Sequence, residues 1–381
     1  MRILVVGPSP HMKHDPGLIV SDFIKEALSL HEIFGCFFHH DFSKHPIGQE
    51  DCLLINDSNI KSKWIDSSKA NSAVIDTYDS LMENDIEVIV SFGSIAESEF
   101  IRAAKETSGK NIQWVHVITI ANHVHDSRFS ETLCSIDLIL TYSESQKNNL
   151  ISVCKVSEDS IFLIERKFET PILLPAHSTE ILCGGWNTES FNLKSVFEAA
   201  SGLGHSFKCL TNYYEYGDFD LESMESVFFK DQNIYPVAFS SLFEKPEAQE
   251  WDSHIDNCKV FVDMSMSQGG CPTLMRAHSA GAKCIIVDTP RHRELARCLG
   301  GIELVRSSVF FSTSGIKLYI PDHLCLHMAI IEVFSNTFSL EKKSTIIIKN
   351  KKIIEKEFYV IFNNIITIGF AEKFLGLESL T

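Results

Sequence analysis

The sequence predicts an α/β protein with two doubly wound, Rossmann-like domains facing a cleft, and three observations support this prediction. Short apolar runs that end near glycine alternate with helical patterns, as in a parallel sheet covered by helices. The alternation pauses where Pro171 and Pro175 flank an apolar trio, and then restarts. The 381 residues suffice for two domains of ordinary size. We therefore expect domains at residues 1–170 and 171–335, followed by a helical segment at 336–381 that packs back on the body.

The first predicted domain contains four apolar runs with the composition of strands buried on both faces. They lie at residues 3–6, 86–93, 112–120 and 136–142. A helix is expected after the first strand because apolar side chains recur on one stripe, formed by Ile19, Phe23, Ala27 and Leu30. Residues 95–105 predict a second helix, so strands and helices alternate along this half of the chain.

The second predicted domain repeats this alternation. Its strands are expected at residues 180–185, 259–262 and 283–287, and its helices at 193–200 and 272–280. The last segment mixes lysines with Ile, Phe and Tyr and is expected to be largely helical. Two interpretations of it stay open: a helix whose apolar side packs on the protein, or an amphipathic helix that associates with the cytoplasmic face of a membrane.

Composition excludes some classes of function. Asp and Glu number 50 against 34 Lys and Arg, so the formal net charge is -16. Nucleic-acid binding in general needs a basic surface, so we expect no nucleic-acid partner. The 11 cysteines include no Cys-x-x-Cys pair and no zinc-ligand spacing, which is typical of scattered thiols in a reducing compartment. The N-terminal apolar run is too short for a signal peptide, and no stretch reaches the roughly 18 apolar residues of a membrane span, so we expect a cytoplasmic protein.

One stretch carries the clearest functional signal. Residues 263–281 read DMSMSQGGCPTLMRAHSAG, which is a strand end followed by a Gly-Gly turn and a helix that starts near Pro272. The next strand, CIIVD at residues 284–288, leads to a segment that contains Glu294. This order of motifs resembles the donor-site signature of the retaining GT-B glycosyltransferases of family 4, in which a Glu-Gly turn precedes a helix that bears a second Glu.

Three further landmarks agree with the resemblance: a Ser-rich helix start at residues 142–150, a strand at 160–164 and a Gly-Gly-Trp turn at 184–186. The resemblance covers about residues 1–335 and is strong only at 263–295. It implies a GT-B fold in which the second domain binds a nucleotide-sugar donor and the first faces a glycan or lipid-linked acceptor. For donor binding it implies Gln268, Gly269, Gly270, Cys271, Pro272, Thr273, Arg276 and Glu294.

Four positions depart from the family pattern. Gln268 and Arg276 stand where the family has its two glutamates. Trp186 and Phe191 stand where the family has the Arg and Lys that clamp the donor diphosphate. Replacing Glu by Arg reverses the charge and removes every hydrogen-bond acceptor. The departures leave two hypotheses open: an enzyme with an altered donor site, or an inactive glycosyltransferase-like subunit that binds a partner or glycan.

The residues themselves favour an anion site of different construction. Gly269 and Gly270 allow a ligand to approach the backbone closely, and Pro272 suits the first turn of a helix. Unpaired N–H groups at a helix start bind phosphate, and Arg276, one turn into the helix, adds a cation. The alternative is that Arg276 is a surface residue paired with an acid.

His123 is the expected catalytic residue because it follows the third predicted strand, at the edge where ligands bind in α/β domains. The resemblance also implies a histidine after this strand that faces the donor sugar. His116, inside the strand, is the second choice. A metal site formed by His123, His125 and Asp126 and a plain polar loop are the alternatives.

Two short motifs have competing interpretations. Pro16 and Gly17 resemble half of the family's first loop, which approaches donor and acceptor, but they also fit an ordinary strand-helix connection. Asp218 and Asp220 have the Asp-x-Asp form of a divalent-cation site, yet no apolar strand leads into them. We expect no metal, and no cofactor beyond the nucleotide-sugar substrate.

The sequence therefore predicts a glycosyltransferase that moves a sugar from a nucleotide-sugar to a glycan, lipid-linked or protein acceptor with retention. An inactive binding subunit is the alternative, and a nucleotide-sugar epimerase of the same two-domain form is a third hypothesis. No carboxylate nucleophile is evident, so the donor phosphate is expected to assist the attack and its charge must be stabilised. The helix start at residues 270–273, with Arg276, is expected to do this.

Overall fold

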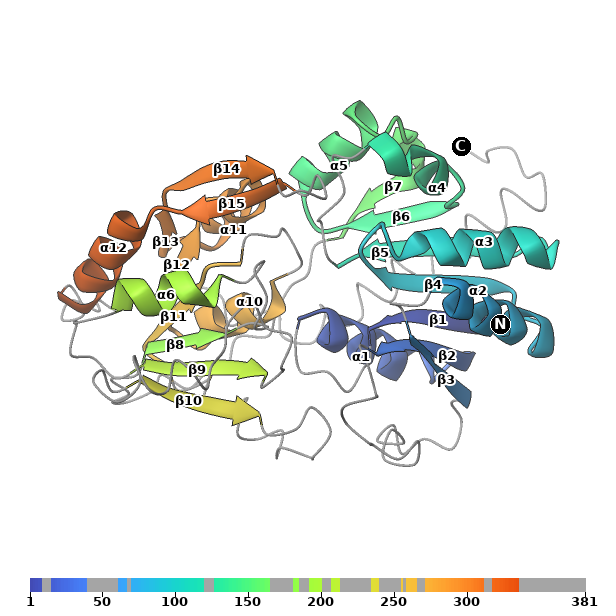
Figure 1. The fold of residues 1–381 in the computed structure, drawn as a ribbon, viewed down its shortest axis with the longest axis horizontal. Helices are drawn as coiled ribbons and strands as arrows, with labels where there is room; N and C mark the ends of the chain where they lie inside the picture. The colour runs from blue at the N-terminus through green and yellow to red at the C-terminus, as the bar shows by residue number, and fades with distance from the viewer. Residues whose placement is uncertain are drawn as a thin grey trace.

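The structure is a computed structural model that describes most of two α/β domains. The described residues are 1–8, 15–39, 61–66, 70–119, 127–164, 181–184, 192–200, 207–212, 234–239, 255, 258–265, 271–311 and 317–335. Their strands form two parallel sheets and one antiparallel hairpin (Figure 1).

The first sheet has seven parallel strands in the order β3-β2-β1-β4-β5-β6-β7. They are β1 (Arg2–Pro8), β2 (Glu32–His39), β3 (Lys61–Asp66), β4 (Val88–Gly93), β5 (Gln113–Ile118), β6 (Leu138–Thr141) and β7 (Ile161–Leu163). The helices between them are α1 (Asp15–Ala27), α2 (Ala70–Glu83), α3 (Ser98–Ser108), α4 (Ser130–Cys134) and α5 (Glu144–Ser152), with short 3-10 turns at Ser127–Phe129 and Glu158–Ser160. We call this part the N domain.

The second sheet has six parallel strands in the order β10-β9-β8-β11-β12-β13. They are β8 (Ile181–Gly184), β9 (Phe207–Asn212), β10 (Ile234–Phe239), β11 (Val260–Asp263), β12 (Lys283–Val287) and β13 (Ile302–Val305). The described helices are α6 (Leu193–Ala200), α10 (Pro272–Ser279), α11 (Pro290–Leu299) and α12 (His323–Ser335), and β14 (Ser307–Phe311) pairs with β15 (Lys317–Pro321) as the hairpin. We call this part the C domain.

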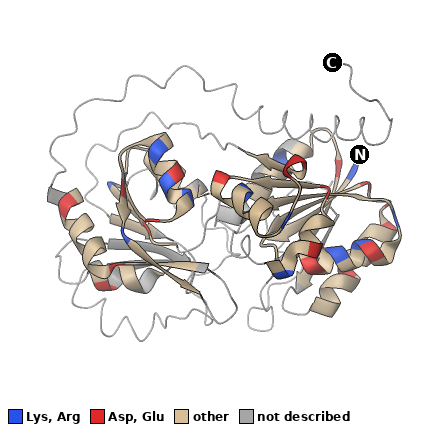
Figure 2. Ribbon diagram, turned by 90° about the horizontal axis from the view of Figure 1, so that it is seen from above, with Lys and Arg blue, Asp and Glu red and all other residues tan. Residues whose placement is uncertain are grey.

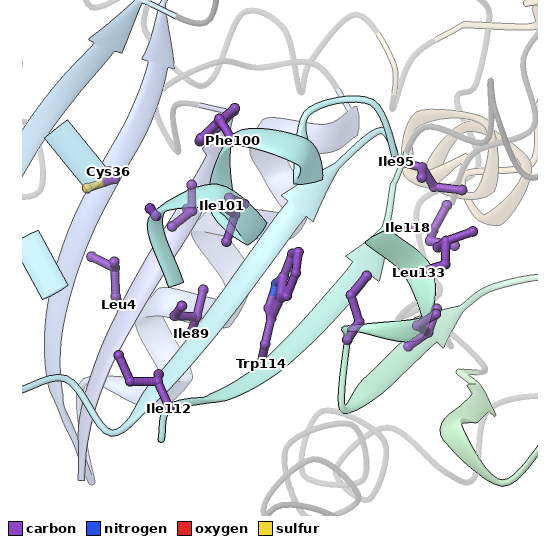
Figure 3. Close-up of a cluster of buried hydrophobic side chains, with 14 of the residues drawn as sticks. Leu4, Cys36, Ile89, Ile95, Phe100, Ile101, Ile112, Trp114, Ile118 and Leu133 are labelled. Atoms are coloured by element: carbon purple, nitrogen blue, oxygen red, sulfur yellow. The ribbon is translucent and has the colours of Figure 1, made fainter. Parts of the chain in front are cut away.

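Each sheet has an apolar core on both faces. Along β1, Leu4 belongs to a cluster with Trp114, whereas Ile3 belongs to a cluster with Phe23 on the opposite face. Figure 3 shows the first cluster, with Trp114 of β5 near its centre. Because both faces are covered, the central strands carry unbroken apolar runs instead of alternating patterns. This explains why such runs predicted them.

The strand order places one ligand-binding edge in each domain. The direction in which successive strands are added to the sheet reverses between β1 and β4 in the N domain and between β8 and β11 in the C domain. In sheets of this kind, ligands bind in the crevice outside the carboxyl ends of the two strands at the reversal. At the first reversal, a Cβ on Gly7 would lie 2.9 Å from the Cβ of Phe92, so only glycine lets the ends of β1 and β4 lie this close.

The predicted fold class is confirmed, whereas some local predictions are wrong. Helix α1 ends at Ala27 and Leu30 is exposed, because the chain turns there to enter β2. Pro16 and Gly17, predicted in a loop, lie in the first turn of α1. Strands β2, β3, β9, β10 and β13 and the β14–β15 hairpin were not predicted. Lysines and polar residues break up the apolar runs of β3 and β9, whereas β2 and β10 are largely apolar and were overlooked. The predicted boundary at 170/171 and the segment 336–381 lie outside the described residues.

Charges of both signs are interspersed on the helices that cover the sheets (Figure 2). The described part of the chain shows no continuous basic stripe of the kind that nucleic-acid binding requires. Among the described helices, none has the length and apolar character needed to cross a lipid bilayer.

Candidate functional site

The reversal in the C domain is where the described part of the predicted donor motif lies. Strand β11 ends at Asp263, whose carboxylate accepts a hydrogen bond of 2.9 Å from the backbone N–H of Ser265. The chain returns to the described region at Cys271, directly before α10. Strands β8 and β11 pair in parallel, so their carboxyl ends lie at the same sheet edge.

Helix α10 begins with an unusual backbone. Cys271 precedes its first residue with φ 52° and ψ 43°, a left-handed conformation that costs a non-glycine residue about 1 kcal/mol or more. Pro272 occupies the first helical position, as predicted, and the Cys271 side chain does not cap the helix. Because its first turn lacks a cap from that residue, α10 presents the type of helix start that receives anions.

A buried Cys–His pair joins the starts of α10 and α11. The His292 Nδ1 lies 2.7 Å from the carbonyl oxygen of Val287, which can only accept, so Nδ1 carries the proton. The Nε2 lone pair then faces the Cys271 thiol at 3.6 Å and accepts from it. Burial lowers the pKa of His292, and the nearby charge of Asp263 opposes this effect without reversing it. The His292 ring is therefore neutral, and its contact with the Cys271 thiol fixes the start of α10 against α11.

Two other predicted donor residues lie on α10. Thr273 and Arg276 are both partly buried, and Arg276 lies one turn into the helix, as predicted. Helix α10 contacts α1 of the N domain, and α1 carries Pro16 and Gly17 in its first turn (Figure 1). The structure thus brings together the helices that bear the predicted donor-side and acceptor-side residues.

Glu294 connects the two domains. One carboxylate oxygen, Oε1, accepts hydrogen bonds from the backbone N–H of Ser145 at 2.9 Å and from the Ser143 hydroxyl at 3.1 Å. The other, Oε2, lies 3.6 Å from Nη1 of Arg291, one helical turn away in α11. Ser143 and Ser145 lie at the start of α5 in the N domain, so both oxygens of Glu294 already have protein partners. Its predicted contact with the donor stays a prediction.

The N domain holds a buried carboxyl before α3 and a buried histidine in β5. Glu97 accepts from the backbone N–H of Ser94 at 2.8 Å, and burial raises the pKa of this carboxyl. His116 lies within β5, with Nδ1 2.7 Å from the Ser91 hydroxyl, and its Nε2 has no hydrogen-bond partner in the part of the chain that the structure describes. Burial lowers the pKa of His116 to about 3. Its side chain is buried in the core, and its role as the second choice for the catalytic histidine stays a prediction.

Several predicted residues lie outside the described residues. They are His123, His125, Asp126, Trp186, Phe191, Asp218, Asp220, Gln268, Gly269 and Gly270. In the part of the chain that the structure describes, no group of three His, Cys, Asp or Glu side chains is arranged to hold a metal ion.

From the sequence, Arg291 and Arg293 were expected to line the cleft of the donor site, and Ser143 was expected at a helix start. The structure shows that Arg291 is about nine-tenths buried and that Ser143 is the N-cap of α5. His292, which is fully buried, was not singled out. The Ser-x-x-Gln pattern at residues 143–146 marks a helix start and could have suggested the cap. Nothing local could have shown that a carboxylate about 150 residues away along the chain binds there.

Comparisons with known proteins show the fold class. No family model matches the chain, and no curated protein matches it. Among solved structures, the lipopolysaccharide outer core galactosyltransferase WaaB in its apo form is 15% identical, with a TM-score of 0.57 over 97% of this chain and 100% of that one. The sucrose-phosphate synthase of Thermosynechococcus elongatus is 12% identical, with a TM-score of 0.61 over 88% and 90%. The UDP-GlcNAc 2-epimerase of Neisseria meningitidis is 12% identical, with a TM-score of 0.55 over 96% and 100%.

These likenesses define a class of protein. The chain has the GT-B fold, with two Rossmann-like domains of the kind found in glycosyltransferases and in nucleotide-sugar epimerases. Membership of family 4 and retention of configuration stay predictions.

Proposed function

We propose that the protein is a glycosyltransferase that moves a sugar, with retention, from a nucleotide-sugar to a glycan, lipid-linked or protein acceptor. The observation that carries the proposal is the position of α10, whose start lies at the strand reversal of the C domain and is not capped by the Cys271 side chain. The similarity to WaaB and to sucrose-phosphate synthase over nearly the whole chain supports the same class of reaction.

In the proposed reaction the donor diphosphate lies at the start of α10. The acceptor hydroxyl attacks the anomeric carbon from the side of the leaving group, the bond to the diphosphate breaks, and the hydroxyl proton passes to a departing phosphate oxygen. Negative charge builds up on that phosphate, so a helix start that is fixed before the reaction lowers the barrier. Residues 269–273 would contact the phosphate through their backbone, and Arg276 would add a cation.

The acceptor side of the proposed site belongs to the N domain. His123 would face the donor sugar, and Pro16 and Gly17 would line the acceptor path at the start of α1. We propose that the protein works in the cytoplasm without a metal. A lipid-linked acceptor would place it at the cytoplasmic face of a membrane, with the basic C-terminal segment as the contact.

A panel of nucleotide-sugars tests the proposal. At least one UDP-, GDP-, dTDP-, ADP- or CMP-sugar should raise the unfolding temperature, because a ligand at 100 times its Kd adds about 2.7 kcal/mol. Thermal shift identifies the donor, and mass spectrometry then follows its sugar to candidate acceptors. If no compound shifts the transition, the inactive-subunit hypothesis replaces the proposal. Isomerised donor without acceptor would instead indicate an epimerase, the activity in the name of one structural neighbour.

Arg276 distinguishes an altered donor site from a ribose pocket of the family type. Arg276→Ala should weaken nucleotide binding by about 1.5–3 kcal/mol, the range for hydrogen bonds to charged groups. Arg276→Glu should weaken it further, because it adds an anion beside the proposed phosphate. Calorimetric titration measures both, with Arg297→Ala in the exposed last turn of α11 as the matched control. Tighter binding by Arg276→Glu would mean that the position contacts ribose and that the anion site is wrong.

A further inference from the structure

We propose that Glu294 is a positioning residue that holds the C domain against the first turn of α5, and so sets the distance between the two domains. Arg291 completes this contact, which we call the α5–α11 contact and define by Ser143, Ser145, Arg291 and Glu294. The effect of this contact on sugar transfer rests on the proposed function, whereas its effect on the distance between the domains is independent of that function.

The hydrogen bonds at Glu294 have a consistent direction. The Ser143 hydroxyl accepts from the backbone N–H of Gln146 at 3.4 Å, as an N-cap should, and donates its own hydrogen to Glu294 at 3.1 Å. The N–H of Ser145 is one of the four that a helix leaves unpaired at its start, and Glu294 accepts it at 2.9 Å. A carboxylate at a helix N-terminus is also favoured by the helix dipole. The start of α5 in the N domain thus provides two hydrogen-bond donors for the Glu294 carboxylate.

Arg291 ties the same carboxylate to the C domain. Only 10% of its side chain is exposed, its Nη1 lies 3.6 Å from Glu294 Oε2, and its Nε has no hydrogen-bond partner among the described residues. A buried guanidinium is costly without a counter-charge. Loss of the Glu294 carboxylate would therefore remove a cap from α5 and leave Arg291 without this counter-charge. The contact between the domains should then weaken by more than the loss of one surface hydrogen bond would weaken it.

The contact is connected to the start of α10 through one helical turn. His292 lies between Arg291 and Glu294 in sequence, and it bonds the Val287 carbonyl and the Cys271 thiol. The turn that holds the N domain is thus the turn that holds the proposed phosphate-binding helix start. The domains also meet where α1 contacts α10, so two helix pairs join the domains (Figure 1).

Two exposed native thiols allow a direct test. Cys134 in α4 and Cys298 in α11 lie in different domains and are both exposed, so they can carry spin labels once Cys52, Cys209 and Cys325 are replaced by Ser. In the otherwise unchanged chain, pulsed electron paramagnetic resonance should give one narrow distance distribution. In Glu294→Ala the distribution should broaden and its mean should change. In Glu294→Gln the change should be smaller, because the amide oxygen still accepts from α5 but carries no charge.

Matched variants separate this role from a general loss of structure. Glu303→Gln, at an exposed position on β13, should keep the narrow distribution. Ser143→Ala removes one of the two hydrogen bonds and should broaden the distribution even if Glu294→Ala fails to fold. For the donor identified by the panel, kcat of Glu294→Gln should fall at least about tenfold while KM changes little, as expected for misaligned reactants.

One result would overturn the proposal. An unchanged distance distribution in folded Glu294→Ala would show that the contact does not set the spacing. If nucleotide affinity then fell, Glu294 would contact the donor, as the family resemblance implies. A wild-type protein that binds no nucleotide-sugar would end the proposed function, while the distance measurements would still decide the role of Glu294.

Discussion

Trp114→Ala should lower the free energy of unfolding by about 3–5 kcal/mol, the cost of deleting a fully buried aromatic side chain. Trp114 is fully buried in β5, packs in the cluster of Figure 3 and donates its indole N–H to the Ser91 hydroxyl at 2.7 Å. The substitution removes this apolar area, leaves a cavity and takes one hydrogen bond from Ser91. Urea unfolding followed by circular dichroism measures the change.

Two further variants serve as controls for Trp114→Ala. Trp114→Phe keeps most of the apolar area and should cost about 1–3 kcal/mol, from the lost hydrogen bond and a smaller cavity. Phe311→Ala, at an exposed position in the hairpin, should stay within about 0.5 kcal/mol of the wild type. If Trp114→Ala cost no more than Phe311→Ala, the tight core around β5 would be wrong.

Acid should destabilise the protein through His116, by about 3 kcal/mol between pH 7 and pH 4. Burial lowers the pKa of His116 from 6.5 to about 3. The unfolded chain binds a proton on this residue below about pH 6.5 and the folded protein does not. Stability from the neutral ring is therefore complete above that pH and is lost as the pH falls toward 3.

The variant His116→Asn isolates this effect. Asparagine keeps a polar group near the Ser91 hydroxyl but has no proton to gain, so its loss of stability between pH 7 and pH 4 should be smaller than that of the wild type by about 3 kcal/mol. Urea unfolding at both pH values gives the difference, and the NMR shift of the His116 ring should stay constant down to about pH 4. A ring that titrates near pH 6 would contradict the burial of this residue.

The sequence predicted the central strands and the class of fold well. Residues 3–6 and 283–287 lie in strands that helices cover on both faces of the sheet. Such strands consist of continuous apolar runs, which can be recognised from a few neighbouring residues. It also predicted the start of α10, because Pro272 has a strong local preference for the first helical turn. Strands β2, β3, β9 and β10 were not predicted. Polar residues weaken the local signal of β3 and β9, whereas the apolar runs of β2 and β10 were overlooked.

What the sequence determined by itself was therefore the set of buried strands, their alternation with helices and the composition of the donor motif. Only the tertiary structure decided which strand ends meet, how deeply Arg291 is buried and which group Glu294 caps. The physical reason is the separation along the chain over which each interaction acts. Apolar periodicity and helix capping act within a few residues, whereas the contact of Glu294 with Ser143 spans 151 residues and exists only because two separately formed sheets present their carboxyl edges to each other.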